Sequence, residues 1–349
     1  MEAADEQVVS FPEGNTPLVS SDRVADWLGI EALGLKHEGM NPTGSFKDRG
    51  MTAGLTQARR TRARAVACAS TGNTSASLAA YAALAGLPAL VLVPAGQVAP
   101  GKLAQTQAYG ARTFAVRGNF DACLALLRQA AGELGVYLLN SVNPWRIEGQ
   151  KTIVLELLQQ LGWQSPDWIT LPGGNLGNTA AFGKALDEAL TLGLIDRLPR
   201  LLVVQASGAA PFARSYSSGF RDRVAVPAET VATAIRIGDP ASHDRAVRAI
   251  QRTQGAVVAV SDGAILDAQA RVGSAGIGCE PASAAAVAGV RAALQSGLIN
   301  RAERVVAVLT GHVLKDPLPE AARELYRAPV EIEATLKSLE SAVRLAGAL

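Results

Sequence analysis

The chain has 349 residues, of which 48% are hydrophobic and 18% charged, and its 33 basic and 31 acidic residues give a net charge of +2. This length suits one large or two ordinary domains, and the balanced charge argues against nucleic acid or a membrane surface as partner. The longest apolar runs are too short to cross a bilayer, and residues 1–17 lack the pattern of a secretory signal. Cys68, Cys123 and Cys279 are too scattered for a disulfide framework, which favours a reducing cytoplasm.

The first unusual stretch of the chain is NPTGSFKDRG at residues 41–50. Its proline and glycines predict an irregular segment, and Ser45 is expected to cap a helix that begins there. Lys47 then falls in the first helical turn, where the positive end of the helix dipole disfavours a charged amine. A lysine in this place suits a neutral nucleophile better than an ordinary solvated charge.

From about residue 64 onward, short apolar runs alternate with longer helical patterns. Strands are predicted at residues 65–70, 89–94, 112–118, 136–141, 167–174, 200–208, 256–262 and 304–311. Helices are predicted at residues 73–86, 101–111, 120–135, 150–162 and 178–193, and the tail at 330–349 has helical periodicity. This alternation predicts an α/β fold, and the number of strands favours two open, mostly parallel sheets, each covered by helices.

Two polar segments directly follow predicted strands, which is where ligands bind in open α/β sheets. STGNTSAS at residues 70–77 offers hydroxyls, an amide and backbone N–H groups for an anion, or else is a well-capped helix start. Gly173, Gly174 and Gly177 lie between a strand and a helix in LPGGNLGNTAAF. That pattern matches neither a dinucleotide nor a triphosphate loop, so it favours the small phosphate of a cofactor over a simple tight turn.

A second anion site is predicted in LNSVNPWRIEGQKT, where Asn140, Ser141, Asn143 and Arg146 share one loop ahead of a helix. An arginine beside hydroxyl and amide donors suits a phosphate or a carboxylate. The alternative is that Arg146 is an ordinary solvated charge.

The remaining segments divide into one candidate and two open cases. Thr310 directly follows the strand predicted at residues 304–311 and presents a hydroxyl there. Glu280 and Ser283 precede a helix of small residues, which predicts close backbone packing, whereas residues 207–240 are either a functional loop or a surface excursion. The three histidines show no metal-ligand spacing.

A lysine, two anion sites and a hydroxyl beyond a strand together suggest pyridoxal phosphate, whose aldehyde forms a Schiff base with a lysine of lowered pKa.

The motifs, taken in order, resemble those of the threonine synthases. They are EGNTPL, EGMNPTGSFKDRGM, ACASTGNTSAS, NSVNPWRIEGQKT, GGNLGN, GCEPASAA and TGHVLKDP, and they extend from about residue 11 to 317. The resemblance is to the short form of these pyridoxal-phosphate lyases, which have the tryptophan synthase β fold, known as fold type II. It implies that O-phospho-L-homoserine and water are converted to L-threonine and phosphate, the last step of threonine biosynthesis.

The resemblance also implies a role for each matching residue. Lys47 is expected to form the Schiff base with the cofactor, and Asn73 to bind its 3′-oxygen. Gly174, Asn175, Leu176, Gly177 and Asn178 are expected to bind the cofactor phosphate, and Thr310 to face the pyridine nitrogen. Thr71, Gly72 and Thr74 are expected to meet the substrate carboxylate, and Arg49, Ser141 and Arg146 the substrate phosphate.

The same resemblance implies a cytoplasmic homodimer with two domains. Residues 1–50 and 146–349 are expected to form the large cofactor-binding domain, and residues 51–145 a smaller, mobile one. Two positions depart from the common motifs: Val313 stands where glycine is usual, and Leu176 where alanine is usual. The alternatives are a threonine or serine dehydratase of the same fold, a non-catalytic phosphometabolite-binding protein and a nicotinamide dehydrogenase, which would need a glycine fingerprint that the sequence lacks.

Overall fold

The computed structural model describes residues 7–96, 100–118, 120–141, 143–316 and 329–345. The chain divides into two compact units, Met1–Pro317 and Leu318–Leu349. In the second unit, helix α13 (Leu336–Leu345) confirms the helical periodicity of the tail, and no residue of this helix is buried.

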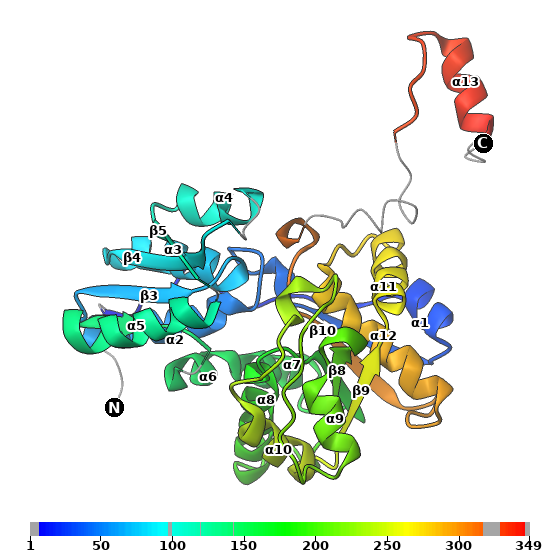
Figure 1. Cartoon of the computed structure of the whole chain (residues 1–349). Coiled ribbons are helices and arrows are strands. Elements are labelled where there is room, and N and C mark those ends of the chain that lie inside the picture. Colours follow the sequence, from blue (N-terminus) through cyan, green and yellow to red (C-terminus); the bar gives the residue numbers. More distant parts are fainter. Residues whose placement is uncertain (1–6, 97–99, 119, 142, 317–328, 346–349) are drawn as a thin grey trace. The chain divides into compact units, whose positions relative to one another are not determined.

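The first unit contains two open sheets, as predicted (Figure 1). The larger has the order β1-β2-β10-β7-β8-β9, and all its strands run parallel except β1, which is antiparallel to β2. Its strands are β1 (Leu18–Ser20), β2 (Ala32–His37), β7 (Trp168–Pro172), β8 (Arg200–Ala206), β9 (Ala256–Val260) and β10 (Arg304–Leu309). The smaller sheet is wholly parallel in the order β5-β4-β3-β6. Its strands are β3 (Ala65–Ala69), β4 (Ala89–Pro94), β5 (Arg112–Val116) and β6 (Val136–Leu138).

The helices lie where the sequence periodicity predicted them, with a few additions. They are α1 (Asp22–Leu28), α2 (Lys47–Arg60), α3 (Asn73–Ala85), α4 (Pro100–Ala108), α5 (Phe120–Leu134), α6 (Pro144–Gln150), α7 (Thr152–Gln160), α8 (Gly177–Thr191), α9 (Pro211–Ser217), α10 (His243–Arg252), α11 (Asp262–Ser274) and α12 (Pro281–Gln295). Short 3₁₀ turns occur at η2 (Glu38–Met40), η3 (Ser207–Ala209), η4 (Thr233–Ile235) and η5 (Val313–Lys315).

Helix α6 corrects the prediction of a loop ahead of a helix that begins at residue 150. The side chain of Asn143 accepts a hydrogen bond from the N–H of Trp145 at 3.0 Å, and Pro144 takes the first helical position. Both are ordinary signals for a helix start. Arg146 is therefore held on a rigid helix.

Alternating side chains of the strands explain why both sheets are covered on both faces. In β8, Leu202 and Val204 pack with α12 in one core, whereas Leu201 and Val203 pack with α8 in another. Successive residues of a strand point to opposite faces, so a run of apolar residues requires a helix layer on each side. The smaller sheet repeats this arrangement, with α3 on the face of Val66 and α5 on the opposite face.

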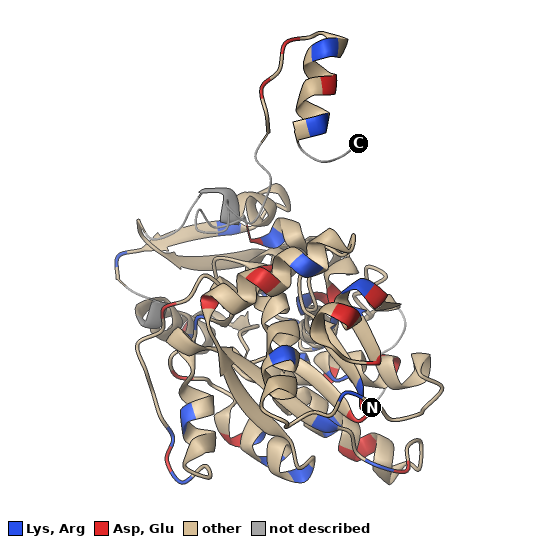
Figure 2. Ribbon diagram, turned by 90° about the vertical axis from the view of Figure 1, so that its right-hand side faces the viewer, with Lys and Arg blue, Asp and Glu red and all other residues tan. Residues whose placement is uncertain are grey.

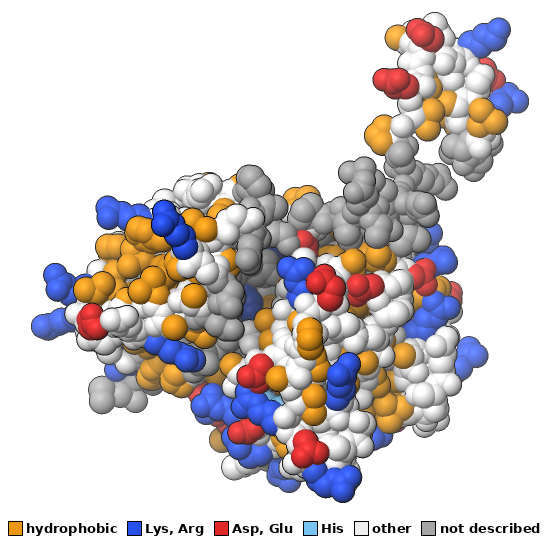
Figure 3. Space-filling view, in the orientation of Figure 1, with side chains coloured by type: hydrophobic (Ala, Val, Ile, Leu, Met, Phe, Trp, Pro, Cys, Tyr) orange, Lys and Arg blue, Asp and Glu red, His pale blue; other side chains and the backbone are white. Residues whose placement is uncertain are grey.

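The surface of the first unit carries both signs of charge. Basic and acidic residues are interspersed along the ribbon in Figure 2, and their side chains are interspersed on the face seen in Figure 3. Figure 3 also shows hydrophobic side chains gathered over the part that carries β4, β5 and α5, where Phe114, Leu126 and Leu134 are exposed. Within the described ranges, no helix combines the length and the hydropathy needed to span a bilayer.

Candidate active site

The segment that leads into α2 pairs with the segment that follows β10. The N–H of Phe46 donates to the carbonyl of Thr310 at 2.9 Å, and the N–H of His312 donates to the carbonyl of Gly44 at 2.9 Å. These bonds place Lys47, the first residue of α2, beside the carboxyl end of β10. The strand end and the helix start that the sequence singled out separately therefore belong to one site.

Ser45 does not cap α2, contrary to the prediction. Phe46 occupies the cap position without a side-chain hydrogen bond. Asp48 takes over the stabilising role, because its carboxylate accepts from the N–H of Thr43 at 2.7 Å and from the Thr43 hydroxyl at 2.6 Å. The Ser45 hydroxyl is buried and finds no partner in the described part of the chain.

Lys47 is a buried amine with a lowered pKa. Burial lowers its pKa, the positive charge of Arg146 lowers it further, and Glu280 opposes them, with a result of about 7. An amine with the usual pKa of about 10.4 is neutral in roughly one molecule in three thousand at pH 7, whereas one with a pKa near 7 is about half neutral. The site therefore supplies a nucleophilic amine at neutral pH.

Thr310, at the end of β10, is buried and shares a hydroxyl network with α12. Its Oγ1 lies 3.0 Å from the Oγ of Ser283, and the N–H of Gly311 donates to that same Oγ at 2.8 Å. The sequence interpretation of residues 278–290 as packing alone was therefore incomplete. Ser283 orients the hydroxyl that follows the strand.

Loops of the smaller sheet carry the other donors. Strands β3 and β6 are neighbours, and the side chain of Asn140 bonds both the N–H and the carbonyl of Ala69 at 3.2 Å. The loop with Thr71 and Gly72 therefore lies next to the loop with Ser141. Thr71, Gly72, Thr74 and Ser141 are half-buried. A Cβ on Gly72 would meet no atom within 4 Å, so the backbone there borders open space.

Asn73 begins α3 and is buried, and it reaches across to the larger sheet. Its Nδ2 donates to both carboxylate oxygens of Glu280, at 3.0 and 3.3 Å. The donor-rich loop of the smaller sheet is thereby tied to the start of α12.

The glycine-rich segment forms a close backbone turn between β7 and α8. The N–H of Gly173 donates to the carbonyl of Val204 at 2.7 Å, and the carbonyl of Asn175 accepts from the N–H of Ser242 at 3.1 Å. A Cβ on Gly174 would lie 3.2 Å from the carbonyl oxygen of Ala234, so this glycine permits a close approach. The segment at residues 207–240, left open by the sequence, thus packs against the turn.

The start of α8 has buried polar atoms that the protein does not satisfy. The Oδ1 of Asn178 and the Oγ1 of Thr179 have no hydrogen-bond partner among the residues described. Such atoms are costly unless a ligand meets them, and a helix N-terminus presents backbone N–H groups to an anion. Gly177 borders Gln150, whose Oε1 is a third buried atom without a partner in the described ranges.

Arg146 is fully buried on α6, and most of its donors are unused. Its Nη1 donates to the carbonyl of Leu139 at 3.2 Å, whereas Nε and Nη2 find no partner in the part of the chain that the structure describes. Burial lowers its pKa to about 10. A buried guanidinium without a counter-charge is expensive, and an incoming anion would relieve that cost.

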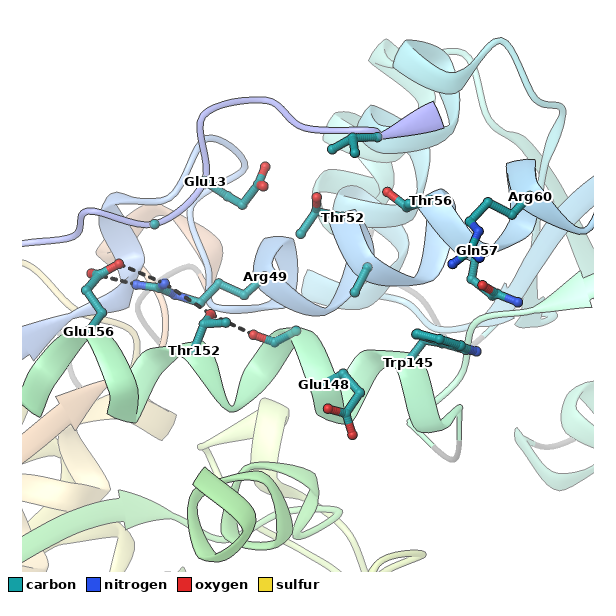
Figure 4. Close-up of a pocket in the computed structure, with 14 residues that line it drawn as sticks. Glu13, Arg49, Thr52, Thr56, Gln57, Arg60, Trp145, Glu148, Thr152 and Glu156 are labelled. Atoms are coloured by element: carbon teal, nitrogen blue, oxygen red, sulfur yellow. Dashed lines mark hydrogen bonds and ion pairs between the residues drawn. The ribbon is translucent and has the colours of Figure 1, made fainter. Parts of the chain in front are cut away.

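Arg49 is placed differently from the expectation that it meets the substrate phosphate. Its Nε and Nη2 donate to Glu38 at 2.7 and 2.8 Å, and its Nη1 and Nη2 donate to Glu156 at 3.0 and 2.8 Å. Figure 4 shows the ion pair with Glu156 from the side of α2 that faces a cavity lined by Thr52, Trp145 and Glu148. These contacts do not support Arg49 as a phosphate ligand, because carboxylates already occupy its donors.

Five further residues lie at the site although the sequence did not assign them to it: Ser45, Gln150, Thr179, Glu280 and Ser283. Four of them lie within motifs that were recognised. The sequence did not single them out because burial and hydrogen-bond partners are properties of the fold. No group of three or more His, Cys, Asp or Glu residues suited to a metal occurs in the described ranges.

Together these features fit a phosphorylated aldehyde cofactor. A half-neutral buried lysine can bond to the aldehyde, and the turn at residues 173–178 with its unsatisfied polar atoms can hold a phosphate. The buried guanidinium of Arg146 acts electrostatically on Lys47 and has donors that could bind a second anion.

Comparisons with known proteins agree with this chemistry. Residues 9–311 match the family model described as pyridoxal-phosphate dependent enzyme. The threonine synthase of Methanosarcina acetivorans is 47% identical over 347 residues, covering 97% of this chain and 84% of that protein. The threonine synthase of Mycobacterium leprae is 50% identical over 311 residues, covering 88% and 84%.

Solved structures show the same fold at low sequence identity. A fungal L-serine ammonia-lyase from Rhizomucor miehei superimposes with a TM-score of 0.77 at 23% identity, covering 89% of this chain and 97% of that one. Maize serine racemase gives a TM-score of 0.73 at 22% identity, covering 95% and 94%. This chain, with its two open, mostly parallel sheets, therefore has the same fold as these two enzymes.

Proposed function

We infer that this chain, which belongs to the family of pyridoxal-phosphate dependent enzymes, is a threonine synthase. The reaction converts O-phospho-L-homoserine and water to L-threonine and inorganic phosphate. The relatives that are 47 to 50% identical over most of the chain carry this name, so a dehydratase is not favoured. The alternatives without pyridoxal phosphate do not fit the family.

The residues that would hold the cofactor are those the sequence predicted. Lys47 would bond to its aldehyde, the backbone of residues 174–178 would bind its phosphate, and Asn73 would meet its 3′-oxygen. Thr310, held by Ser283, would face the ring nitrogen. When bound, the cofactor supplies an electron sink that stabilises negative charge at the substrate carbons.

Lys47 also carries the proton transfers. With its Nζ free of the cofactor, Lys47 would be a buried amine whose pKa is lowered by burial and by Arg146, which suits a general base and acid at pH 7. It removes the Cα proton of the substrate and assists removal of a Cβ proton. Phosphate would leave from Cγ and take up a proton, Cγ would gain a proton, water would add its hydroxyl to Cβ, and a proton would return to Cα.

The choice of a phosphorylated substrate rests on the burial and the unused donors of Arg146. Arg146 is fully buried, its Nε and Nη2 have no partner among the described residues, and its charge acts on Lys47. A dehydratase acting on threonine or serine has no phosphate to place there. We propose that Arg146 binds the leaving phosphate with help from Ser141, while Thr71, Gly72 and Thr74 meet the substrate carboxylate.

The test is a paired assay of the wild type and Arg146→Gln on O-phosphohomoserine and on threonine. A charge-assisted hydrogen bond is worth about 1.5–3 kcal/mol, so kcat/KM on O-phosphohomoserine should fall roughly tenfold to a hundredfold. Threonine lacks the phosphate, so any deamination of threonine should change far less. Arg248→Gln, at an exposed arginine of α10, is the matched control.

Two results would contradict the proposal. Equal losses on both substrates in Arg146→Gln would make Arg146 a structural residue. A wild type that prefers threonine to O-phosphohomoserine would make the enzyme a dehydratase.

We also propose the organisation that the resemblance implies. Residues 1–50 and 146–349 would form the cofactor-binding domain, and residues 51–145, which contain all four strands of the smaller sheet, the mobile one. The enzyme would act as a cytoplasmic homodimer, consistent with three buried free cysteines. Sedimentation velocity tests the dimer, and a single monomeric species at micromolar concentration would contradict it.

A further inference from the structure

Glu280 is a buried carboxylate that the proposed reaction leaves unused. Only 2% of the residue is exposed. Its N–H donates to the carbonyl of Gly311 at 3.0 Å, and its own carbonyl accepts from the N–H groups of Ser283 and Ala284 at the start of α12. The backbone is thus fixed on both sides, and the side chain has a defined position in the site.

Gly311 makes room for the Glu280 side chain. A Cβ on Gly311 would lie 2.5 Å from the carboxyl carbon of Glu280, a distance that real atoms do not adopt. The carboxylate therefore lies directly against the backbone that follows Thr310. From there it accepts both contacts of the Asn73 Nδ2, at 3.0 and 3.3 Å. This contact fixes which way the Asn73 amide points.

Charged groups from several elements face this carboxylate. Lys47 comes from α2, and Lys315 and Asp316 come from the segment at η5. Burial raises the pKa of Glu280 to about 7; the Asn73 bond and the two lysines lower it, and Asp316 raises it. Lys47, which Arg146 also faces, has a pKa near the same value, and Glu280 raises that pKa. Two groups of opposite charge that titrate in the same range bind protons as a coupled pair.

We propose that Glu280 is a positioning residue that orients the Asn73 amide toward the cofactor and sets the protonation of the Lys47 nitrogen. The inference rests on the proposed function in that the cofactor bonds to Lys47 and meets Asn73. It requires no turnover and no particular substrate, so it can be tested separately.

Substitutions separate the two parts of this role. Glu280→Gln removes the negative charge and keeps an acceptor for Asn73. Glu280→Ala removes the charge and the acceptor together. Asp316→Asn is the charge control, because it also removes one carboxylate, and that carboxylate acts on Glu280 by repulsion.

The first experiment follows the visible absorption of the bound pyridoxal phosphate against pH. Loss of a nearby carboxylate destabilises the protonated form of the Lys47 nitrogen. The pH at the midpoint of the absorption change should therefore fall by about one unit in Glu280→Gln. In Asp316→Asn the repulsion on Glu280 is gone and Glu280 remains ionised at lower pH. In Asp316→Asn the pH at the midpoint of the absorption change should therefore stay the same or rise.

The second experiment measures the dissociation constant of pyridoxal phosphate in a double-mutant cycle. Glu280→Ala and Asn73→Ala should each weaken binding about tenfold, and the double variant should lose clearly less than the roughly hundredfold expected of independent effects, since part of the effect of Glu280 passes through that amide. Additive losses would overturn the positioning of Asn73.

The titration has its own decisive outcomes. An unchanged midpoint in Glu280→Gln, or an equal fall in Asp316→Asn, would overturn the effect on Lys47. If Glu280→Gln does not fold, Asp316→Asn decides alone: a fall overturns the proposal, and a rise or no change supports it. A wild type with the expected titration but no turnover of O-phosphohomoserine would contradict the proposed function and leave this inference standing.

Discussion

Leu176 adopts a left-handed backbone conformation, with φ of 61° and ψ of 14°, in the turn before α8. A residue with a Cβ pays about 1–2 kcal/mol for this conformation. The side chain is only 2% exposed and belongs to the core shared with α8, so burial offsets the strain. The departure at Val313 is milder, because Val313 is not among the residues with positive φ and packs against Gly278. The structure thus locates the strain at the proposed phosphate turn.

This conformation reverses the usual order of glycine and alanine at position 176. Leu176→Gly should unfold at a higher temperature than Leu176→Ala, by roughly 2 °C, because glycine adopts positive φ without strain. Ala180→Gly, inside α8, is the control and should destabilise, since glycine lowers helix stability. Differential scanning calorimetry of the three variants is the measurement. A Leu176→Ala variant more stable than Leu176→Gly would refute the strain.

Helix α2 is anchored by a buried ion cluster that spans three other elements. Arg49 bonds Glu38 of η2 and Glu156 of α7, and Lys36 of β2 bonds Gln160 of α7 at 2.8 Å. Burial lowers the pKa of Lys36 although both carboxylates oppose it. Burial raises the pKa of Glu156, but its hydrogen bonds from Arg49 and Lys36 outweigh that effect and lower it to about 2. The cluster therefore fixes the helix that presents Lys47.

Glu156→Gln should destabilise the enzyme by about 2–4 kcal/mol at pH 7, since it leaves Lys36 and part of Arg49 without a counter-charge. The folded pKa of Glu156 is depressed, so its contribution is present above about pH 4.5 and is lost as pH falls toward 2. The difference from wild type should therefore narrow between pH 7 and pH 3. Glu188→Gln, at a more exposed ion pair, should cost less than about 1 kcal/mol. Urea unfolding at both pH values is the test, and a constant difference would contradict it.

At the scale of the molecule, the site is assembled from the carboxyl ends of strands in both sheets. Lys47, Thr310 and the turn at residues 173–178 belong with the larger sheet, whereas Asn73 and Ser141 follow strands of the smaller one. The hydrogen bond from Asn73 to Glu280 directly joins the residues of the smaller sheet to those of the larger sheet. A substrate held by both groups would draw the loops of the smaller sheet inward.

Hydrogen exchange tests this movement of residues 51–145. Addition of threonine and phosphate to the holoenzyme should slow exchange at the start of α3 and in the loop after β6, because a bound ligand restricts local opening. Strand β9 of the larger sheet should be unaffected and is the internal control. Equal slowing in both regions, or none, would contradict a mobile smaller domain.

Local patterns in the sequence were sufficient for most of the fold. Apolar runs marked eight of the ten strands in the described ranges, and β1 and β2 were not assigned. Predicted strands ran too far at their carboxyl ends, as at residues 136–141 against Val136–Leu138, because polar residues there belong to loops. Lys47 could be singled out because a lysine at a helix start contradicts an elementary electrostatic preference. Its assigned role and those of the other site residues stay predictions.

Long-range contacts decided what the sequence could not. Glu38 and Glu156 are far apart along the chain, yet both bond Arg49, so carboxylates occupy the donors that the sequence offered to a phosphate. Glu280 looked like part of a packed helix start until Asn73, 207 residues away, proved to be its partner. The sequence by itself determined which side chains carry charge and where most of the strands and many of the helices form, because those follow from neighbours along the chain. Only the tertiary structure determined which charges are satisfied and which, like Arg146, remain buried with donors to spare, because burial and pairing depend on residues that the fold alone brings together.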